Sequence, residues 1–233
     1  MSTGTSIKTL CTLAMQVAMP RLEQLCAEAG IPAFDQHFAP TKLLMERIHA
    51  GDLADIAFLT TEATDELEQA GRITAADRTD LAVSLVGVAV RAGAPRPDIG
   101  TTESFVQALR DAKSIAYSRA GASGIYFAGL IERLGIAAEV NAKATIIPSG
   151  FTAEQVANGS CELAVQQVSE LMAVKGVDIV GPLPKALEVR ATFAGVLLGR
   201  GSQGEAARQA LALLASPAAA EAFRAGGLVP VQG

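Results

Sequence analysis

Strand-like apolar runs alternate with helix-length amphipathic segments along this chain of 233 residues, and this alternation constrains the fold more than any other feature. Three helical patterns in the first third of the chain each stop at a glycine, Gly30, Gly51 or Gly71, the residue type that most often ends a helix. A βαβαβα order predicts a parallel sheet flanked by helices. The expected strands are residues 6–11, 33–38 and 55–59, and the expected helices are residues 17–29, 41–50 and 62–70.

A second α/β unit follows a segment that cannot be regular secondary structure. Residues 93–97 read Gly-Ala-Pro-Arg-Pro, and they follow a near-continuous apolar strand at residues 81–90. Strands and helices alternate again beyond this boundary. We expect helices at residues 102–112, 123–134 and 152–158, and strands at residues 114–117, 144–147, 162–166 and 178–180. A turn at residues 181–184, a long apolar strand at residues 190–198 and two helices at residues 205–214 and 217–225 complete the chain.

The two long apolar strands bracket the middle unit, so the chain is expected to cross twice between two lobes. Lobe 1 is residues 1–85 and 192–233, and lobe 2 is the inserted segment 86–191. Each lobe is expected to be a largely parallel sheet flanked by helices, with the ligand crevice between the lobes at the crossover. Periodicity leaves open the alternative of a single three-layer domain.

Charge and cysteine usage exclude several classes of function. The net charge of −5 comes without a Lys/Arg stripe, so nucleic acid is not an expected partner. Three widely spaced cysteines and two histidines form no metal or redox motif, so we expect reduced thiols, no metal and no cofactor. No apolar run is long enough for membrane insertion. Residues 1–6 form no apolar leader, which predicts a cytoplasmic protein as written, or a periplasmic one if a leader has been removed. A monomer and a homodimer both stay open.

The strongest local signal for a ligand follows the expected strand at residues 114–117. Ser118 and Arg119 end that strand, and a small-residue loop leads into a helix at Ser123 or Gly124. Such a turn presents backbone N–H groups to a negative ligand, and an arginine beside it can grip a carboxylate with two hydrogen bonds. The alternative is an ordinary helix capped by Ser123, with Arg119 in solvent.

Three more places at expected strand ends point to an anion. Lys42 lies in the first turn of a helix, where its charge opposes the helix dipole unless an anion is near; otherwise it is a solvated lysine. Gly150 and Phe151 offer free backbone amides before a helix that Thr152 could cap. Gln166 and Gln167 end a buried strand, where their amides need hydrogen-bond partners, and at least one of the two is expected to face the ligand.

The order of elements and three motifs resemble the type 2 periplasmic-binding-protein superfamily, in particular the molybdate-binding proteins of ABC importers. The motifs are residues 46–55 (ERIHAGDLAD), residues 124–126 opening a helix, and residues 216–221 (SPAAAE), and the resemblance spans residues 7–229. The chain departs from that family where the oxyanion is held. Thr12, Thr41 and Lys42 stand where the family has serines, and Gln166-Gln167 replaces a tyrosine, which disfavours molybdate.

A closer resemblance links the chain to the branch of this superfamily that includes aconitate isomerase. Residues 77–81, 88–99, 115–118, 166–171 and 178–181 are similar to that branch, which also holds many solute-binding proteins. The resemblance implies a polycarboxylate ligand. Two functions follow, a cofactor-independent isomerase that moves a proton across the allylic system of an unsaturated di- or tricarboxylate, and a solute-binding protein of the ABC-transporter type without catalysis. The absent leader favours the isomerase.

The isomerase hypothesis requires a catalytic base, and the sequence offers two candidates without deciding between them. His37 is the imidazole nearest to an expected strand end, and Tyr117 is the second candidate. A lone histidine is equally consistent with a packed or solvated residue, and His49 is expected on a helix surface. Ser169 and Glu170 suggest a hydrolase, but no histidine motif or GxSxG elbow accompanies them.

Overall fold

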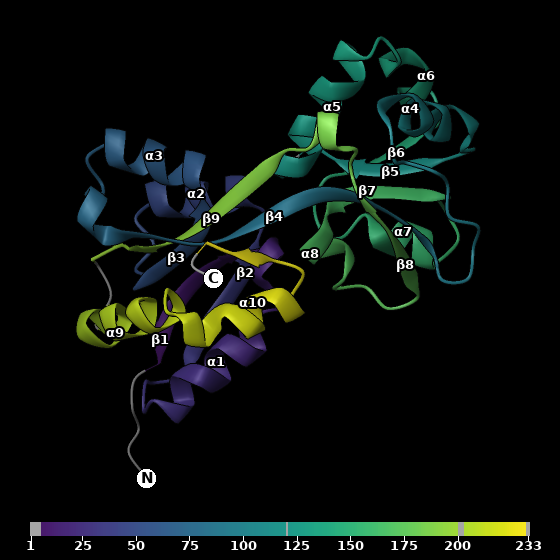
Figure 1. Ribbon diagram of the computed structural model, residues 1–233. Helices are drawn as coiled ribbons and strands as arrows, with labels where there is room; N and C mark the ends of the chain where they lie inside the picture. Colours follow the sequence, from purple (N-terminus) through teal and green to yellow (C-terminus); the bar gives the residue numbers. More distant parts are fainter. Residues whose placement is uncertain (1–5, 120, 200–202, 232–233) are drawn as a thin grey trace. The chain divides into compact units, whose positions relative to one another are not determined.

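The computed structural model describes residues 6–119, 121–199 and 203–231, and it shows the mixed α/β architecture that the alternation predicts (Figure 1). The chain forms two compact units. Unit 1 consists of the described residues of Met1–Val83 and Thr192–Gly233, and unit 2 is Ser84–Ala191 without residue 120. The expected crevice between two lobes stays a prediction, as do the lobe boundaries that the sequence indicates.

Unit 1 is a mixed sheet with helices on both faces. The strand order is β2-β1-β3-β9-β4, with β10 beside β4; β1, β2 and β3 are parallel, and β9 runs antiparallel to β3. Helices α2 and α3 cover one face and α1, α9 and α10 the other (Figure 1). The strands are β1 (Ile7–Thr12), β2 (Phe34–Ala39), β3 (Ile56–Thr60), β4 (Arg78–Arg91, continuing into unit 2), β9 (Arg190–Leu197) and β10 (Val229–Pro230). The helices are α1 (Met19–Glu28), α2 (Thr41–His49), α3 (Thr61–Gln69), α9 (Gly204–Leu214) and α10 (Ala220–Ala225).

Unit 2 repeats the α/β plan, again with three parallel strands. Its order is β6-β5-β7-β4, with β8 also paired to β4; β5 is parallel to both β6 and β7, whereas β4 is antiparallel to β7 and β8. The main core cluster combines aromatic and aliphatic side chains of β4, β5 and β7 with those of α4 and α5. The remaining strands are β5 (Ile115–Ser118), β6 (Ala144–Ile147), β7 (Leu163–Gln167) and β8 (Val177–Pro182), and the helices are α4 (Thr102–Asp111), α5 (Ala122–Arg133), α6 (Ala137–Asn141), α7 (Ala153–Ala157) and α8 (Val168–Leu171).

The structure corrects several local expectations. Helix α5 begins at Ala122, not at Ser123 or Gly124, and Gly181 with Pro182 extends strand β8 where a turn was expected. The short elements α6, α8 and β10 were not predicted, because two to five residues are too few to show a period. Residues 217–225 form a 3-10 turn before α10 and not one continuous helix.

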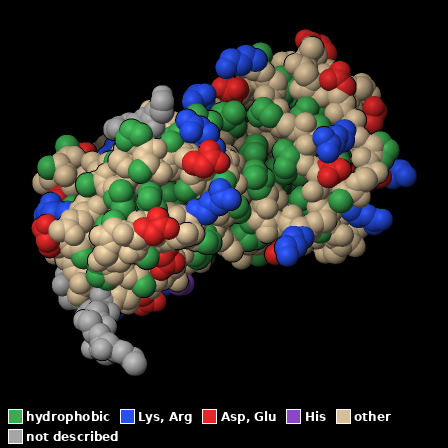
Figure 2. Space-filling view, turned by 60° about the horizontal axis from the view of Figure 1, so that its bottom comes forward, with side chains coloured by type: hydrophobic (Ala, Val, Ile, Leu, Met, Phe, Trp, Pro, Cys, Tyr) green, Lys and Arg blue, Asp and Glu red, His purple; other side chains and the backbone are tan. Residues whose placement is uncertain are grey.

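The surface charge and the lengths of the helices can be compared with the expected absence of nucleic-acid and membrane partners. On the face shown in Figure 2, Lys and Arg side chains are interspersed with Asp and Glu, so that face presents no basic stripe. None of the described helices is both long and apolar enough to cross a membrane. Residues 1–5, most of the stretch that was expected to contain no leader, lie outside the described residues.

Candidate functional site

The carboxyl ends of three parallel strands meet at one edge of the unit 2 sheet. Ser118 of β5 lies opposite Ile147 of β6, and Ala116 of β5 lies opposite Ala164 of β7, so the segments that follow these strands begin side by side. We call this edge the unit 2 carboxyl edge and define it as the described residues of 117–124, 148–152 and 166–170. It brings together most of the residues expected to bind a ligand: Tyr117, Ser118, Arg119, Ser123, Gly124, Gly150, Phe151, Gln166 and Gln167.

Helix α5 packs directly onto the end of β5. A Cβ atom on Gly124 would overlap the carbonyl oxygen of Ser118, so only glycine permits this approach. Ser118 and Ser123 are buried, and the N-cap residue Gly121 provides no capping side chain. Ser123 is therefore not the cap of this helix, and the N–H groups of the first turn keep the positive end of the helix dipole at the edge.

Tyr117 lies in the core and holds Arg119. Its ring is fully buried against Phe127, with ring centroids 5.2 Å apart, and its hydroxyl group donates to Oδ1 of Asn141 at 2.6 Å. The guanidinium group of Arg119 donates to the same hydroxyl oxygen at 3.0 Å and lies 5.8 Å from the ring centroid. Arg119 is exposed and makes no ion pair with the described residues. The hydroxyl of Tyr117 is thus engaged twice, and its role is to position a free cation.

Gln166 connects two segments of the edge through its own hydrogen bonds. Its Oε1 atom accepts from the backbone N–H of Thr152 at 2.8 Å and from the Thr152 hydroxyl group at 3.0 Å. Its Nε2 atom donates to the carbonyl oxygen of Gly150 at 3.1 Å. Gln166 therefore fixes the loop between β6 and α7, whose Gly150 and Phe151 amides donate no hydrogen bond to the described residues.

Two buried polar residues of this edge are unusual: Gln167 has an oxygen atom without a hydrogen-bond partner among the described residues, and Glu170 has a raised pKa. The Oε1 atom of Gln167 is buried and has no hydrogen-bond partner among the described residues. Glu170 is only 8% exposed. Burial raises the pKa of its carboxyl group from 4.5 to about 7, although hydrogen bonds from the Gln167 backbone and the Gln166 side chain lower it. A carboxyl group with this pKa can both accept and release a proton near neutral pH.

The sequence did not predict a role for Glu170 in proton transfer. Ser169 and Glu170 were considered together only as a hydrolase signal, and Ser169 instead shares a buried hydrogen bond of 3.3 Å with Ser84. The available signal was an acidic residue between Ser169 and Leu171, just after a strand of wholly buried residues. Such an acid is either paired with a cation or shifted in pKa.

In unit 1, the carboxyl ends of β1 and β2 form a second edge, the unit 1 carboxyl edge. Thr12 lies opposite Ala39 in the register, so Thr12 and the start of α2, with Thr41 and Lys42, share that edge. Lys42 is exposed and has no partner among the described residues, and the N-cap residue of α2, Pro40, provides no side-chain cap. His37 lies opposite Leu10, two residues before the end of β2, and is exposed on the edge strand. The structure does not bring His37 to either carboxyl edge.

The comparisons with known proteins agree with this architecture. The family model of bacterial extracellular solute-binding proteins matches residues 26–229. The chain belongs to this family. An aconitate isomerase from Pseudomonas sp. is 38% identical over 186 residues, which cover 79% of this chain and 71% of that protein. Both resemblances found in the sequence are thereby confirmed.

Solved structures with low sequence identity share the fold. The periplasmic molybdate-binding protein of Azotobacter vinelandii has a TM-score of 0.80 and 18% identity, and the match covers 96% of this chain and 99% of that one. The sulfate-binding protein SubI of Mycobacterium tuberculosis H37Rv has a TM-score of 0.76 and 16% identity, with 97% of this chain and 87% of that chain covered. At these identities the likeness carries the fold alone.

Proposed function

We propose that this protein is an isomerase that shifts a double bond in a small unsaturated di- or tricarboxylate, without a redox cofactor. The observation that carries the proposal is the 38% identity to an aconitate isomerase over 79% of this chain. The unit 2 carboxyl edge adds a chemical reason, since it combines a free cation, uncapped helix amides and a carboxyl group that titrates near neutral pH.

We assign the binding of substrate carboxylates to Arg119 and to the amides of the α5 first turn and of Gly150 and Phe151. Hydrogen bonds from charged or helix N-terminal donors to a carboxylate are stronger than those between neutral groups. Tyr117 supports this role because it fixes the guanidinium group of Arg119. Gln167 has a buried oxygen that needs a donor, and a substrate hydroxyl or a protonated substrate carboxyl group would supply one.

We assign the proton transfer to Glu170 in place of His37 and Tyr117. The ionised carboxyl group removes a proton from the methylene carbon next to the double bond, and the electron pair of that C–H bond becomes part of a new double bond. The original double bond shifts by one position, and the proton returns to the carbon at its far end. The negative charge that develops between these steps is stabilised by the same donors that hold the carboxylates. The balance requires no oxidant or reductant.

The solute-binding alternative has an observation of its own. The matching family model describes extracellular solute-binding proteins, which favours a protein that binds a solute and performs no chemistry. That description also gives no support to a cytoplasmic location, and a periplasmic location fits it better. Molybdate stays disfavoured as the ligand, because hydroxyl donors are few at the unit 1 edge.

Proton NMR of the protein with cis-aconitate and with trans-aconitate tests the proposal. Isomerase activity will convert each compound into the same equilibrium mixture, and in heavy water the product will carry deuterium if the proton on Glu170 exchanges with solvent. Thermal unfolding with the same acids and with molybdate measures binding separately, because a ligand of the folded state raises the melting temperature. Stabilisation by aconitate without any conversion over many hours would decide for the solute-binding function.

A further inference from the structure

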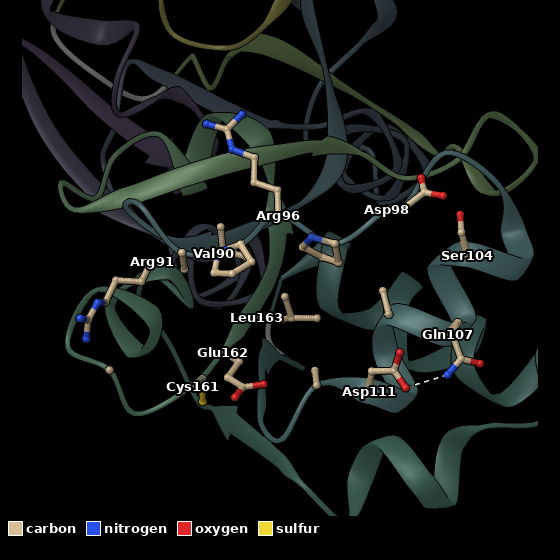
Figure 3. Close-up of a pocket in the computed structure, with 16 residues that line it drawn as sticks. Val90, Arg91, Arg96, Asp98, Ser104, Gln107, Asp111, Cys161, Glu162 and Leu163 are labelled. Carbon is tan, nitrogen blue, oxygen red and sulfur yellow. Dashed lines mark hydrogen bonds between the residues drawn. The ribbon is translucent and has the colours of Figure 1, made fainter.

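A cavity of about 700 Å³ lies at the opposite edge of the unit 2 sheet (Figure 3). Its walls come from the end of β4 with the Pro-rich segment that follows, from α4, and from residues 159–163, which lead into β7. Ala89, next to Val90, lies opposite Ala164, the second residue of β7, and Leu163 at the start of β7 lines the cavity. The cavity is therefore at the amino end of β7, whereas Gln167 ends that strand. All lining residues belong to unit 2.

The floor of the cavity is apolar and well ordered by the core. Val90, Ala108, Ala112 and Leu163 line it, and all four are at least 91% buried. Cavities of this size with an apolar floor and a few charged groups are typical of sites for small organic molecules. The Pro-rich segment at residues 93–97, which the sequence marks as a boundary, thus forms a wall of the cavity.

Charged side chains of both signs line the cavity around this floor. Two of them have partners of their own, since Arg96 pairs with Asp178 at 3.4 Å and Asp98 accepts a hydrogen bond from the Gly100 backbone. Figure 3 shows Arg91 on one side and the carboxylates of Asp111 and Glu162 on another. Arg91 makes no ion pair with the described residues, and its guanidinium group lies beside Gly159, where a Cβ atom would be 3.3 Å from Nη1.

The two carboxylates keep room for a ligand. Asp111 accepts one hydrogen bond of 2.7 Å from Gln107, and Glu162 accepts one of 2.8 Å from the backbone of Lys113. Glu162 also lies 3.9 Å from Nζ of the exposed Lys113 side chain, a loose ion pair that a ligand ammonium group can replace. A carboxylate has about four acceptor positions, so both can accept more.

We propose that this cavity binds a second small molecule, a zwitterion whose ammonium and carboxylate groups are separated by an apolar segment, with the chemistry of a short hydrophobic peptide. The carboxylate lies against Arg91, the ammonium group against Asp111 and Glu162, and the apolar segment on the floor. A cavity of about 700 Å³ measures about 9 Å across, if treated as a cube. Two to three extended residues span ~7–11 Å, whereas the charges of a single α-amino acid are too close together to reach both sides.

Calorimetric titration with L-leucyl-L-leucine tests the proposal. Two capped analogues isolate the charges, since N-acetyl-leucyl-leucine lacks the ammonium group and leucyl-leucine amide lacks the carboxylate. We expect submillimolar binding of the dipeptide and at least about tenfold weaker binding of each analogue. Arg91→Gln should weaken binding of the dipeptide at least about tenfold and leave binding of leucyl-leucine amide unchanged, because the amide has no carboxylate. Asp111→Asn should also weaken binding of the dipeptide, and it should leave binding of N-acetyl-leucyl-leucine unchanged, because that analogue has no ammonium group. Arg21→Gln, on an exposed arginine of α1, is the matched control.

Cys161 gives an independent readout because it lines the cavity. Burial raises the pKa of Cys11 to about 12 and that of Cys26 to about 11, so these thiols react slowly with alkylating reagents. The dipeptide should slow the alkylation of Cys161, mapped by mass spectrometry, and leave the rates at the other cysteines unchanged.

The outcomes separate this site from the proposed isomerase site. Arg119→Ala should leave dipeptide binding intact, and Arg91→Gln should leave polycarboxylate binding intact. The proposal is overturned by the absence of dipeptide binding at millimolar concentration, by equal affinity for the capped analogues, or by binding that neither Arg91→Gln nor Asp111→Asn changes.

Discussion

Among the described residues, unit 1 and unit 2 each bury one carboxyl group, Asp55 and Glu170, and the two groups are held in different ways. Asp55, just before β3 of unit 1, is 4% exposed and accepts hydrogen bonds of 2.9 Å from the backbone N–H groups of Lys8 and Gln203. Glu170 of unit 2 is hydrogen-bonded by one backbone amide and by the side chain of Gln166, and burial still raises its pKa to about 7. Two backbone donors fix Asp55 as a structural link, whereas Glu170 is poised for proton exchange.

The cationic side chains of the two carboxyl edges differ in how well they are fixed. Arg119 of unit 2 is fixed by the hydroxyl group and ring of Tyr117, whereas Lys42 of unit 1 is exposed and has no partner in the described part of the chain. A side chain that is already ordered loses less conformational entropy when a ligand binds. We therefore propose that unit 2 provides the chemistry and most of the ligand affinity, and that the buried acid of unit 1 contributes to stability.

The largest expected effect is on catalysis. Glu170→Gln removes the proton acceptor and keeps the size of the side chain, so kcat for aconitate isomerisation should fall ~10³-fold, a typical loss for a general base, with KM little changed. Glu154→Gln, on an exposed acid of α7, is the control and should retain full activity. Initial rates by proton NMR measure both. Activity of Glu170→Gln within about threefold of the parent would remove Glu170 from the reaction.

The next effect concerns stability in unit 1. Asp55→Asn replaces one accepting oxygen by an NH₂ group that faces a backbone N–H, which leaves a buried donor without a partner. We expect the free energy of unfolding to fall by about 3 kcal/mol in urea denaturation at pH 5. Glu170→Gln under the same conditions should change it by less than about 1 kcal/mol, because the glutamate is already mostly protonated. Equal losses in the two variants would contradict the distinction between the two acids.

The pH dependence of stability separates the acids further. The pKa of Glu170 is raised from 4.5 to about 7 in the folded protein, so its stabilising contribution is complete below pH 4.5 and is lost as the pH rises through about 7. Between pH 5 and pH 8 the parent protein should lose about 2 kcal/mol more than Glu170→Gln does. Urea midpoints measured across this range for both proteins provide the test, and parallel curves would mean that Glu170 keeps an ordinary pKa.

Arg119→Ala should lower the affinity for aconitate by about 2 kcal/mol, the usual value of a hydrogen bond to a charged group. Arg119→Lys is the informative companion, because it keeps the charge but loses the planar group that Tyr117 holds and that binds a carboxylate twice. We expect it to recover less than half of the loss. Titration calorimetry measures both variants. Unchanged affinity in Arg119→Ala would place the anion site elsewhere.

The sequence predicted the two α/β repeats and the strand ends well, because apolar periodicity and helix-ending glycines are local signals. It also placed Arg119 and the two glutamines at the ends of strands. It could not assign partners. Tyr117 was a candidate base until the structure showed its hydroxyl between Asn141 and Arg119, and Gln166 was a candidate ligand residue until its bonds to Thr152 and Gly150 were visible. Hydrogen-bond partners distant in sequence leave no periodic trace.

The antiparallel direction of some strands and the raised pKa of Glu170 could not be predicted from the sequence, for a related reason. The apolar character of β4 and β9 indicates burial but not direction, since a strand buried on both faces shows no alternation. The pKa of Glu170 depends on how completely α8 is covered, and α8 has only four residues. Such properties follow from packing around a residue and not from the residues next to it.

Lys42→Ala should have the smallest effect, with two components of opposite sign. The lysine stands in the first turn of α2, where its charge opposes the helix dipole, so its removal should raise the free energy of unfolding of the free protein by about 0.3 kcal/mol. The affinity for aconitate should fall by less than about 1 kcal/mol, because an exposed lysine must be ordered before it can hold a carboxylate. Denaturation with and without saturating aconitate resolves the two components. A loss as large as that of Arg119→Ala would give unit 1 an equal share in binding the anion, and no loss at all would leave the anion to unit 2.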